Sequence, residues 1–321
     1  MNKNVCSTVD LRARRSAQAG KGLRKAAGID GGGTGTTLVL LQEDGRQERR
    51  HFGAFNFNSI GEERFRSLLA VLSDVIAGAE GCEMVCIGAA GISNPQMKEM
   101  ILEAGEKYGF SDRLMLRGDQ EIALYGAMSG AAGAILIAGT GSICTGRGKD
   151  GRTVRTGGWG HLIDDVGSGY SIGRDVLRSV VRACDGRQEQ TLLTELVQEH
   201  WRVSDLEGII AKTYETTEKS NIAALSRLAE EGARRGDKAA RQLLEENAED
   251  LCVLAETVYD RLGEEELSMC LMGGLLSHDT QYRAMVTRRL QEGGRRILLK
   301  KPDMDAAAGA ALWAWNTAQG R

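Results

Sequence analysis

The chain has 321 residues, of which 42% are hydrophobic and 26% are charged, and its formal net charge is −3. This length predicts two domains, and the composition is typical of a globular protein. No apolar run approaches the roughly 18 residues that a membrane-spanning helix needs, so we expect no membrane partner. The 42 glycines greatly outnumber the two prolines, and they cluster, which indicates backbone that turns sharply or approaches a ligand.

The start of the chain is a basic leader, which we assign to residues 1–25. Residues 1–27 carry seven Lys or Arg residues and a single acid, Asp10. The leader lacks the apolar core of a secretory signal, so we expect a disordered tail or an over-long start, with a transit peptide as the alternative. Because the rest of the chain then carries a net charge of −9, we expect no nucleic-acid partner.

Seven cysteines are spread along the chain without the spacing of a small disulfide scaffold. The odd count predicts reduced thiols and a cytoplasmic location. Cys82 and Cys86 lie beside an apolar segment, but no CxxC pair or His-rich cluster accompanies them. We therefore expect no metal site at these thiols.

The predicted elements begin with a strand hairpin and continue with strands that alternate with helices. This order of elements occurs twice along the chain. In chain order we expect strands at 26–30, 36–42, 46–53, 84–90 and 113–118, strand pairs over 133–158, strands at 268–274 and 295–300, helices at 62–79, 95–109, 119–130 and 305–316, and mostly helix from 170 to 262. The repeated order predicts an α/β fold made of two related halves. We assign domains to 26–130 and 131–321, with a helical insertion in the second and a last helix able to pack back on the first.

The stretch "GIDGGGTGTT" joins the first two predicted strands. Gly31, Gly32 and Gly33 remove the β-carbons from the turn, so that backbone N–H groups can converge on an anion. Thr34 adds a hydroxyl donor, and Asp30 can hold Mg²⁺ through water. Because no helix follows at once, the turn is neither a P-loop nor a dinucleotide fingerprint. A glycine hairpin without a ligand is the alternative.

Two further glycine stretches lie in the second half. The second loop, in "LIAGTGSICTG", consists of Gly139, Thr140, Gly141 and Ser142. Because each half opens on such a loop, we expect both loops to grip one phosphate chain. The third stretch, "CLMGGLLS", has Gly273 and Gly274 where a strand gives way to a helix. A flat ligand lying against this backbone and simple strand–helix packing are both compatible with it.

The stretch "RTGGWGHLIDDVGSGYSIGRDVLRSVV" surrounds Trp159 with glycines ahead of an amphipathic helix. The indole offers an apolar face and an N–H donor, and Asp164 and Asp165 offer acceptors. This combination suits a polyhydroxylated ligand. A surface loop with a capping aspartate is the alternative, and we expect His161 to be structural.

Together these stretches resemble the acetate and sugar kinase, heat-shock ATPase and actin superfamily, and more narrowly the N-acetylglucosamine and glucosamine kinases grouped with BadF-type ATPases. The motifs are "GIDGGGTGTT", "GAFNFNSIG", "GDQEIALYGA", "AGTGS", "GGWGHLIDDVGSGYSIGRDVLR", "NIAALSRLAEEGARRGDKAA" and "LMGGLLS". The resemblance covers residues 26–318. It implies two ribonuclease-H-like domains with a central interdomain cleft that holds Mg-ATP and an amino sugar, and it implies a homodimer.

The resemblance also implies roles for individual residues. Asp119 matches the catalytic base, although the residues alone favour a helix cap. The other matches are Thr34 and Thr140 to ATP-phosphate contacts, Ala223 to the nucleotide side, Gly158, Trp159, Gly160 and Asp165 to sugar contacts, and Asn56, beside Asn58, to one more sugar contact. A carboxylate within roughly 2.6–3.2 Å of a sugar hydroxyl can accept its proton as the P–O bond forms. Most of the acceleration should come from alignment and from charge stabilisation by Mg²⁺ and backbone donors.

The chain departs from the family pattern at two positions. Gly35 stands where relatives often carry a basic residue, which removes a possible phosphate contact. Val166 replaces the glutamate of a common "DEGS" motif, so the sugar preference can differ, and Asp164 is near enough in sequence to compensate.

Three functions follow from these observations. The first is an ATP-dependent hexosamine kinase that phosphorylates the 6-hydroxyl of N-acetylglucosamine or glucosamine, with N-acetylmuramic acid as a subclass. The second is an ATPase activator of a 2-hydroxyacyl-CoA dehydratase, which would need exposed cysteines for an iron–sulfur cluster. The third is a non-catalytic sugar sensor, against which Asp30, Asp119 and both phosphate loops count.

Overall fold

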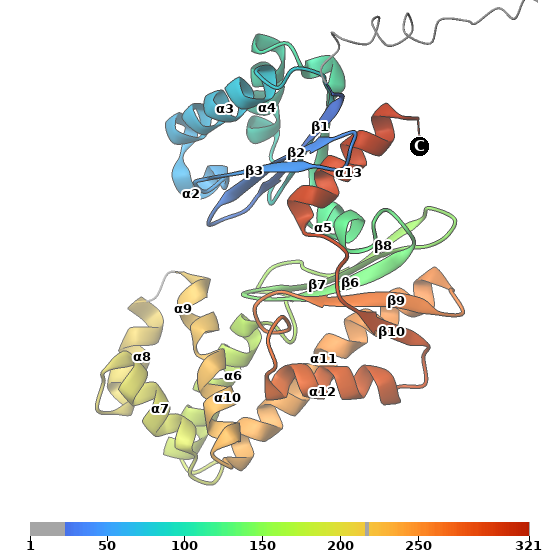
Figure 1. Cartoon of the computed structure of the whole chain (residues 1–321). Helices are drawn as coiled ribbons and strands as arrows, with labels where there is room; N and C mark the ends of the chain where they lie inside the picture. The colour runs from blue at the N-terminus through green and yellow to red at the C-terminus, as the bar shows by residue number, and fades with distance from the viewer. Residues whose placement is uncertain (1–22, 216–217, 321) are drawn as a thin grey trace, which may run out of the picture. The chain divides into compact units, whose positions relative to one another are not determined.

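The computed structural model describes residues 23–215 and 218–320. This part of the chain divides into two compact units, one running to Ile122 and including Ala306 onward, the other running from Ala123 to Asp305. Each unit contains a five-stranded mixed sheet with helices against it (Figure 1). The predicted α/β fold of two related halves is therefore confirmed. Most of the expected leader lies outside the described residues, and the domain bounds and the cleft stay predictions.

The first unit has the strand order β3-β2-β1-β4-β5. Its elements are β1 (Lys25–Gly31), β2 (Thr36–Gln42), β3 (Gln47–Phe52), α2 (Phe57–Ile60), α3 (Glu62–Ala77), β4 (Cys82–Ala89), α4 (Pro95–Lys107), η1 (Ser111–Arg113), β5 (Leu114–Gly118), the start of α5 (Asp119–Ala127) and α13 (Ala306–Ala318). β1 pairs antiparallel with β2 and parallel with β4. A hairpin followed by parallel strands with helical crossovers produces this order.

Helices cover both faces of the first sheet. Along β2, Leu38 and Leu40 belong to the apolar core that includes α3 and α4, whereas Val39 packs against α13. This alternation follows from the two-residue period of a strand. Gly28 explains how closely α13 approaches, because a β-carbon there would lie 2.1 Å from the backbone nitrogen of Ala311. Figure 1 shows α13 lying along the β1–β2 region of this sheet.

The second unit repeats the same order, since its sheet reads β8-β7-β6-β9-β10 from the hairpin side. Its elements are the end of α5, β6 (Gly133–Ala138), β7 (Ser142–Arg147), β8 (Thr153–Gly157), α6 (Gly169–Cys184), α7 (Leu192–Trp201), α8 (Leu206–Glu215), α9 (Lys219–Ala224), α10 (Ser226–Arg234), α11 (Lys238–Leu262), β9 (Leu267–Met272), α12 (Gln281–Glu292) and β10 (Ile297–Lys300). The helical stretch predicted from 170 to 262 is α6 to α11.

The core of the second unit lies between its sheet and the helices α6, α10, α11 and α12. Leu136 of β6, Val176 of α6 and Leu251 of α11 are fully buried in one apolar cluster. Asp237 fixes the helical layer, because its carboxylate caps α11 through the N–H of Ala240 at 2.7 Å and also accepts from the N–H of Leu192 at 2.7 Å. One side chain thus orients the first turns of α7 and α11.

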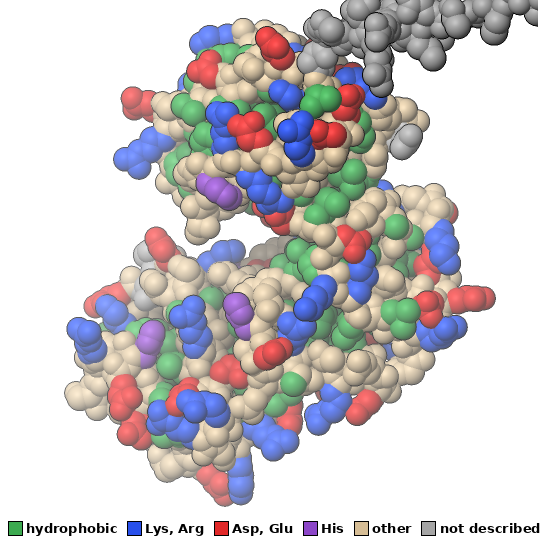
Figure 2. All heavy atoms as spheres, in the orientation of Figure 1, with side chains coloured by type: hydrophobic (Ala, Val, Ile, Leu, Met, Phe, Trp, Pro, Cys, Tyr) green, Lys and Arg blue, Asp and Glu red, His purple; other side chains and the backbone are tan. Residues whose placement is uncertain are grey.

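The surface of the described residues is mixed in charge. On the face drawn in Figure 2, acidic and basic side chains intermingle rather than forming patches of one sign. None of the helices in residues 23–215 and 218–320 is long and apolar enough to cross a membrane. The six cysteines in these residues are free thiols, and all but Cys184 are buried.

Candidate functional site

Two sequence motifs of the first unit lie at one edge of its sheet. The parallel strands β1, β4 and β5 align so that Gly31, Ala89 and Gly118 form one row across the sheet. The glycine turn follows Gly31, and Asp119 follows Gly118, so two strand spacings, about 10 Å, separate their starting points. Ligands of α/β proteins bind outside the carboxyl ends of parallel strands. The predicted phosphate loop and the predicted base therefore share the edge where a ligand is expected.

The glycines of the β1–β2 turn have different reasons to be glycine. A β-carbon at Gly31 would lie 2.5 Å from the buried ring of Phe55, so packing excludes a side chain there. Gly32 closes the turn by donating its N–H to the carbonyl of Gly35 at 2.9 Å. Gly33 has open space around its missing β-carbon and is outside the left-handed region. The fold does not require glycine at Gly33, whereas a ligand that approaches the backbone would.

Asn56 lies beside this turn because Phe55 donates its backbone N–H to the carbonyl of Gly32 at 3.0 Å. The ring of Phe55 packs edge-to-face on Phe65 with centroids 5.0 Å apart, which anchors the segment in the core. Asp30, the next-to-last residue of β1, is half-buried at the same edge. The first unit thus gathers Asp30, the first glycine loop and Asn56 around one turn.

Asp119 is the first residue of α5 and is exposed. Its Oδ1 accepts the N–H of Gln120 at 2.9 Å, and within the described residues its Oδ2 accepts no hydrogen bond. Glu121 reaches back to the N–H of Gly118 at 2.6 Å, which is the return half of a capping box. Asp119 and Glu121 therefore each accept one backbone N–H at the start of α5, and Asp119 keeps one carboxylate oxygen available.

The second glycine turn, between β6 and β7, is braced by α6. Gly139 donates its N–H to the carbonyl of Gly141 at 2.9 Å, and its own carbonyl accepts from Gly169 at 2.8 Å. The carbonyl of Thr140 accepts from Tyr170 at 3.2 Å, while the Thr140 side chain stays exposed. The first N–H groups of α6 are thus used by the turn, which fixes its backbone.

Ser142 and Asp165 brace the same turn from the other side. The hydroxyl of Ser142, 3% exposed, donates to the carbonyl of Val166 at 2.6 Å. Asp165 is 4% exposed, and its Oδ2 lies 2.8 Å from where a β-carbon of Gly141 would be. Its Oδ1 accepts the N–H of Gly160 at 3.3 Å. A phosphate contact by Ser142 and a sugar contact by Asp165 stay predictions; both side chains join the two loops.

The Trp159 loop presents the indole to solvent, with 63% of the residue exposed. Asp164 accepts the backbone N–H of Trp159 at 3.2 Å. Arg155, which sequence reasoning missed, donates to the carbonyls of Gly157 and Gly158 and stacks on the indole, with its Cζ 4.2 Å from the ring centroid. The only sequence signal for Arg155 is its position two residues before the "GGWG" motif.

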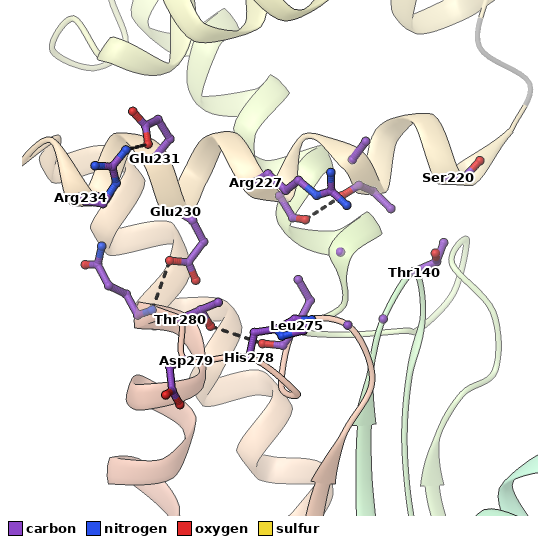
Figure 3. A pocket seen from close by; sticks show the side chains of 17 residues that line it. Thr140, Ser220, Arg227, Glu230, Glu231, Arg234, Leu275, His278, Asp279 and Thr280 are labelled. Atoms are coloured by element: carbon purple, nitrogen blue, oxygen red, sulfur yellow. Dashed lines mark hydrogen bonds and ion pairs between the residues drawn. The ribbon is translucent and has the colours of Figure 1, made fainter. Parts of the chain in front are cut away.

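A cavity of about 930 Å³ opens beside the second glycine turn. Its walls are that turn, the first residue of α6, the helices α9 and α10, and the loop from Gly274 to Gln281 (Figure 3). Figure 3 shows Thr140 at the tip of the β6–β7 turn and Arg227, Glu230 and Arg234 along α10, opposite the loop that carries His278. A volume of this size is typical of small-molecule sites.

The two glycines of the third stretch follow the end of β9, and the structure constrains them differently. Gly273 has φ 88°, and a β-carbon there would lie 2.4 Å from the carbonyl oxygen of Ala138, so the fold requires glycine. Gly274 has no atom near its missing β-carbon and lines the cavity. Ala223, 8% exposed, also lines the cavity.

The charged residues on α10 differ in how they are used. Glu231 pairs with Arg234 and Arg235, and these hydrogen bonds lower the pKa of Glu231 below its usual value. Glu230 accepts the N–H groups of Gln281 and Tyr282 at 3.2 and 2.9 Å and so caps α12. Arg227 is exposed and has no hydrogen bond or ion pair with the described residues. Among the described residues, Arg227 is therefore the cation of α10 that is available to a ligand. Nothing in the sequence around Arg227 had indicated this role.

Tyr282, in the first turn of α12, connects this helix to the segment that follows Asp165. It is 1% exposed, and its hydroxyl donates to the carbonyl of Gly167 at 2.6 Å. Burial raises the pKa of Tyr282 well above its usual value, so the hydroxyl remains protonated and able to donate. The second unit therefore ties its predicted nucleotide side to its predicted sugar loop.

Comparisons with known proteins show which family this chain resembles. The family model described as the BadF/BadG/BcrA/BcrD ATPase family matches residues 27–314. The chain is 30% identical to an N-acetylmuramic acid/N-acetylglucosamine kinase of Clostridium acetobutylicum, over 90% of this chain and 98% of that protein. It is also 30% identical to an N-acetyl-D-glucosamine kinase of Dictyostelium discoideum, over 90% and 97%. A crystal structure of a candidate N-acetylglucosamine kinase from Chromobacterium violaceum superposes with a TM-score of 0.70 at 30% identity, covering 91% of this chain and 99% of that one.

Proposed function

Because the chain belongs to the BadF/BadG/BcrA/BcrD ATPase family, we propose that it is an ATP-dependent kinase that phosphorylates the 6-hydroxyl of N-acetylglucosamine or glucosamine. Two relatives at 30% identity over nine-tenths of the chain are named as kinases of N-acetylated amino sugars. The observation that carries the proposal is the cavity at the carboxyl ends of β6 and β9, where Gly139, Thr140 and Gly274 present backbone and a hydroxyl.

The nucleotide is expected in this cavity. The β-carbon positions of Gly139 and Gly274 are free of close neighbours, so a polyphosphate can approach the backbone there. Thr140 would donate its hydroxyl to a phosphate oxygen, and Ala223 and Leu275 would give the base apolar contacts. Arg227 would add positive charge for the phosphates or a flat guanidinium for the base.

Asp30 is the residue proposed to hold Mg²⁺, through water. The described residues contain no cluster of three or more His, Cys, Asp or Glu side chains that could hold a metal. This fits Mg²⁺, which usually keeps several waters and takes one or two carboxylates plus substrate phosphates. When bound, the ion would neutralise charge on the phosphate oxygens.

Asp119 is proposed as the general base. Its exposed carboxylate, with Oδ2 not engaged by the described residues, is available to accept the proton of the sugar hydroxyl as the new P–O bond forms. The adjacent glycine turn at the same sheet edge would hold the transferred phosphoryl group. This mechanism also requires the two units to close on the substrates, which stays a prediction.

The sugar is proposed to bind against Trp159, Gly158 and Gly160, with Asn56 as a further contact and Asp165 as a contact or a brace. The exposed indole would be an apolar wall for a ring face, and backbone groups of the adjacent glycines would supply directional hydrogen bonds. Val166 gives the loop an apolar side chain next to Asp165. N-acetylmuramic acid is the substrate subclass to compare with N-acetylglucosamine. The homodimer and the cytoplasmic location remain part of the proposal.

The test is an ADP-release assay against glucose, glucosamine, N-acetylglucosamine and N-acetylmuramic acid. Asp119→Asn should lower kcat by roughly 10³-fold with little change in sugar binding, because a general base contributes about 10²- to 10⁴-fold. Asp112→Asn, which removes an exposed carboxylate of the same unit, is the matched control and should retain activity. Full turnover in Asp119→Asn would contradict the role of Asp119 as general base. A wild type that turns over none of these sugars would contradict the proposed kinase activity.

The thiols argue against the dehydratase-activator alternative. An iron–sulfur cluster needs deprotonated cysteines that can reach the metal. Burial raises the pKa of Cys86 and of Cys252 to about 12, and it raises the pKa of Cys144 as well, so that among the described cysteines Cys184 is the exposed thiol that a shared cluster could use. Protein purified with iron and a visible absorbance band would revive that alternative.

A further inference from the structure

The side chain of Arg155 reaches three consecutive residues of the Trp159 loop. Its Nε donates to the carbonyl of Gly157 at 3.1 Å, its Nη2 donates to the carbonyl of Gly158, and its Cζ lies 4.2 Å from the indole centroid of Trp159. A planar guanidinium can make such contacts together, because its N–H donors lie in the plane while its face stacks on an aromatic ring.

Two glycines precede Trp159, and the second of them, Gly158, leaves room for the guanidinium of Arg155. Gly157 and Gly158 have φ values of 72° and 74°, a conformation that favours glycine. A β-carbon at Gly158 would also lie 3.1 Å from Nη2 of Arg155 and 3.0 Å from Ile143. A larger residue at Gly158 would crowd the guanidinium, whereas a β-carbon at Gly157 would lie 2.8 Å from the side chain of Leu254.

The N–H side of the same loop is held by acids. Asp164 accepts from Trp159 at 3.2 Å, and Asp165 accepts from Gly160 at 3.3 Å. Arg155 itself forms no ion pair with a carboxylate among residues 23–215 and 218–320. Its charge is thus directed at two carbonyls and at the ring of Trp159, a residue that is 63% exposed.

We propose that Arg155 is a positioning residue for the sugar, which fixes Trp159 and the Gly157–Gly158 backbone in the orientation that binds the ring. This inference rests on the proposed function and adds a residue to it. Ordering a large side chain on binding costs affinity, and a preformed orientation avoids that cost. Arg155 should therefore act on sugar affinity through Trp159, with little effect on the chemical step.

The first experiment measures kinetics with N-acetylglucosamine, or with the sugar that the wild type uses best. Arg155→Met should raise the sugar KM about 10-fold, with kcat and the KM for ATP within twofold of wild type. Arg155→Lys should give an intermediate sugar KM, because an ammonium keeps the charge but loses the bidentate and stacked geometry. Arg261→Met is the matched control, since Arg261 donates to the backbone carbonyl of Arg155 at 3.0 Å without touching the loop; its sugar KM should stay within twofold. An unchanged sugar KM in Arg155→Met would overturn the inference.

The second experiment tests whether the effect passes through Trp159. In a Trp159→Leu background, Arg155→Met should raise the sugar KM less than twofold further, because residues in contact are not additive. Acrylamide should quench tryptophan fluorescence more strongly in Arg155→Met than in wild type, and this difference should vanish in the Trp159→Leu background. Additive effects, or unchanged quenching, would make Arg155 a general structural residue.

The quenching arm needs no turnover, so it separates two failures. Suppose that the wild type phosphorylates no sugar, but acrylamide quenches Arg155→Met more strongly than wild type. The proposed function would then be wrong, while the Arg155–Trp159 contact would be supported. An active wild type whose Arg155 variants bind sugar normally would remove only the present inference. Arg155→Lys supplies both readouts if Arg155→Met does not fold.

Discussion

The two glycine–threonine turns occupy equivalent places in the two sheets but differ in their support. In the first, the bond between Gly32 and Gly35 closes the turn and Phe55 bonds the carbonyl of Gly32, but Thr34 lies at the tip beside the open space at Gly33. In the second, Thr140 lies on a turn whose carbonyls accept two N–H groups of α6 and whose Gly141 packs on Asp165. Neighbouring segments bond the second turn at its threonine, through Tyr170, whereas among the described residues they bond the first turn only at Gly31 and Gly32, before its threonine.

The difference suggests a division of labour within a duplicated fold. A turn whose backbone bonds are already satisfied presents a fixed surface, so a ligand that binds it orders little. A turn with few external bonds has to be ordered when the ligand arrives, which costs conformational entropy. We expect the second turn to define where the phosphates bind and the first turn to adapt to them.

The largest effect should come from adding one methyl group to each turn. Neither Gly141 nor Gly35 has left-handed backbone, so alanine is conformationally permitted at both. At Gly141 the methyl would lie 2.8 Å from the carboxylate of Asp165, whereas at Gly35 it would lie 3.6 Å from the nearest atom, the carbonyl oxygen of Phe52. Gly141→Ala should displace Asp165 and raise the sugar KM at least 10-fold, and Gly35→Ala should stay within twofold. Equal sugar KM values for the two variants would show that Asp165 is not braced by the turn.

A smaller effect should come from the two threonine hydroxyls. Both side chains are exposed, so Thr34→Val and Thr140→Val should leave the melting temperature unchanged. Thr140→Val should raise the KM for ATP about fivefold, because one hydrogen bond at an exposed position contributes about 1 kcal/mol net. Thr34→Val should raise it about twofold, since its hydroxyl must first be ordered. The reverse ranking, measured at saturating sugar, would contradict the division of labour.

The sequence predicted the repeated hairpin, the order of strands and helices, and the clusters of glycine, because these are patterns in neighbouring residues. It could not distinguish Gly273, which the carbonyl of Ala138 requires, from Gly274, which has no close neighbour. That distinction depends on which atoms lie across the fold. Arg155 was missed for the same reason, since its partners become apparent only when β8 and the following loop are folded together.

The smallest effect concerns the hydroxyl that begins the second strand of each sheet. Thr36 and Ser142 each stand two residues after the turn threonine, and each donates to a loop carbonyl at 2.6 Å, to Gly53 and Val166 respectively. Both hydroxyls are buried, but Gly53 is exposed and Val166 is half-buried. Water can replace the lost donor at Gly53 more easily than at Val166, and an unsatisfied buried carbonyl is the costly outcome.

Ser142→Ala should therefore lower the free energy of unfolding by about 1–2 kcal/mol and Thr36→Val by about 0.5–1 kcal/mol. Urea denaturation of the two variants, followed by circular dichroism with equal m-values, provides the measurement. Ser142→Ala should also raise the sugar KM slightly, because Val166 adjoins Asp165, whereas Thr36→Val should not. A larger loss for Thr36→Val would mean that the first turn depends on its surroundings more than the second, and the proposed contrast between them would have to be reversed.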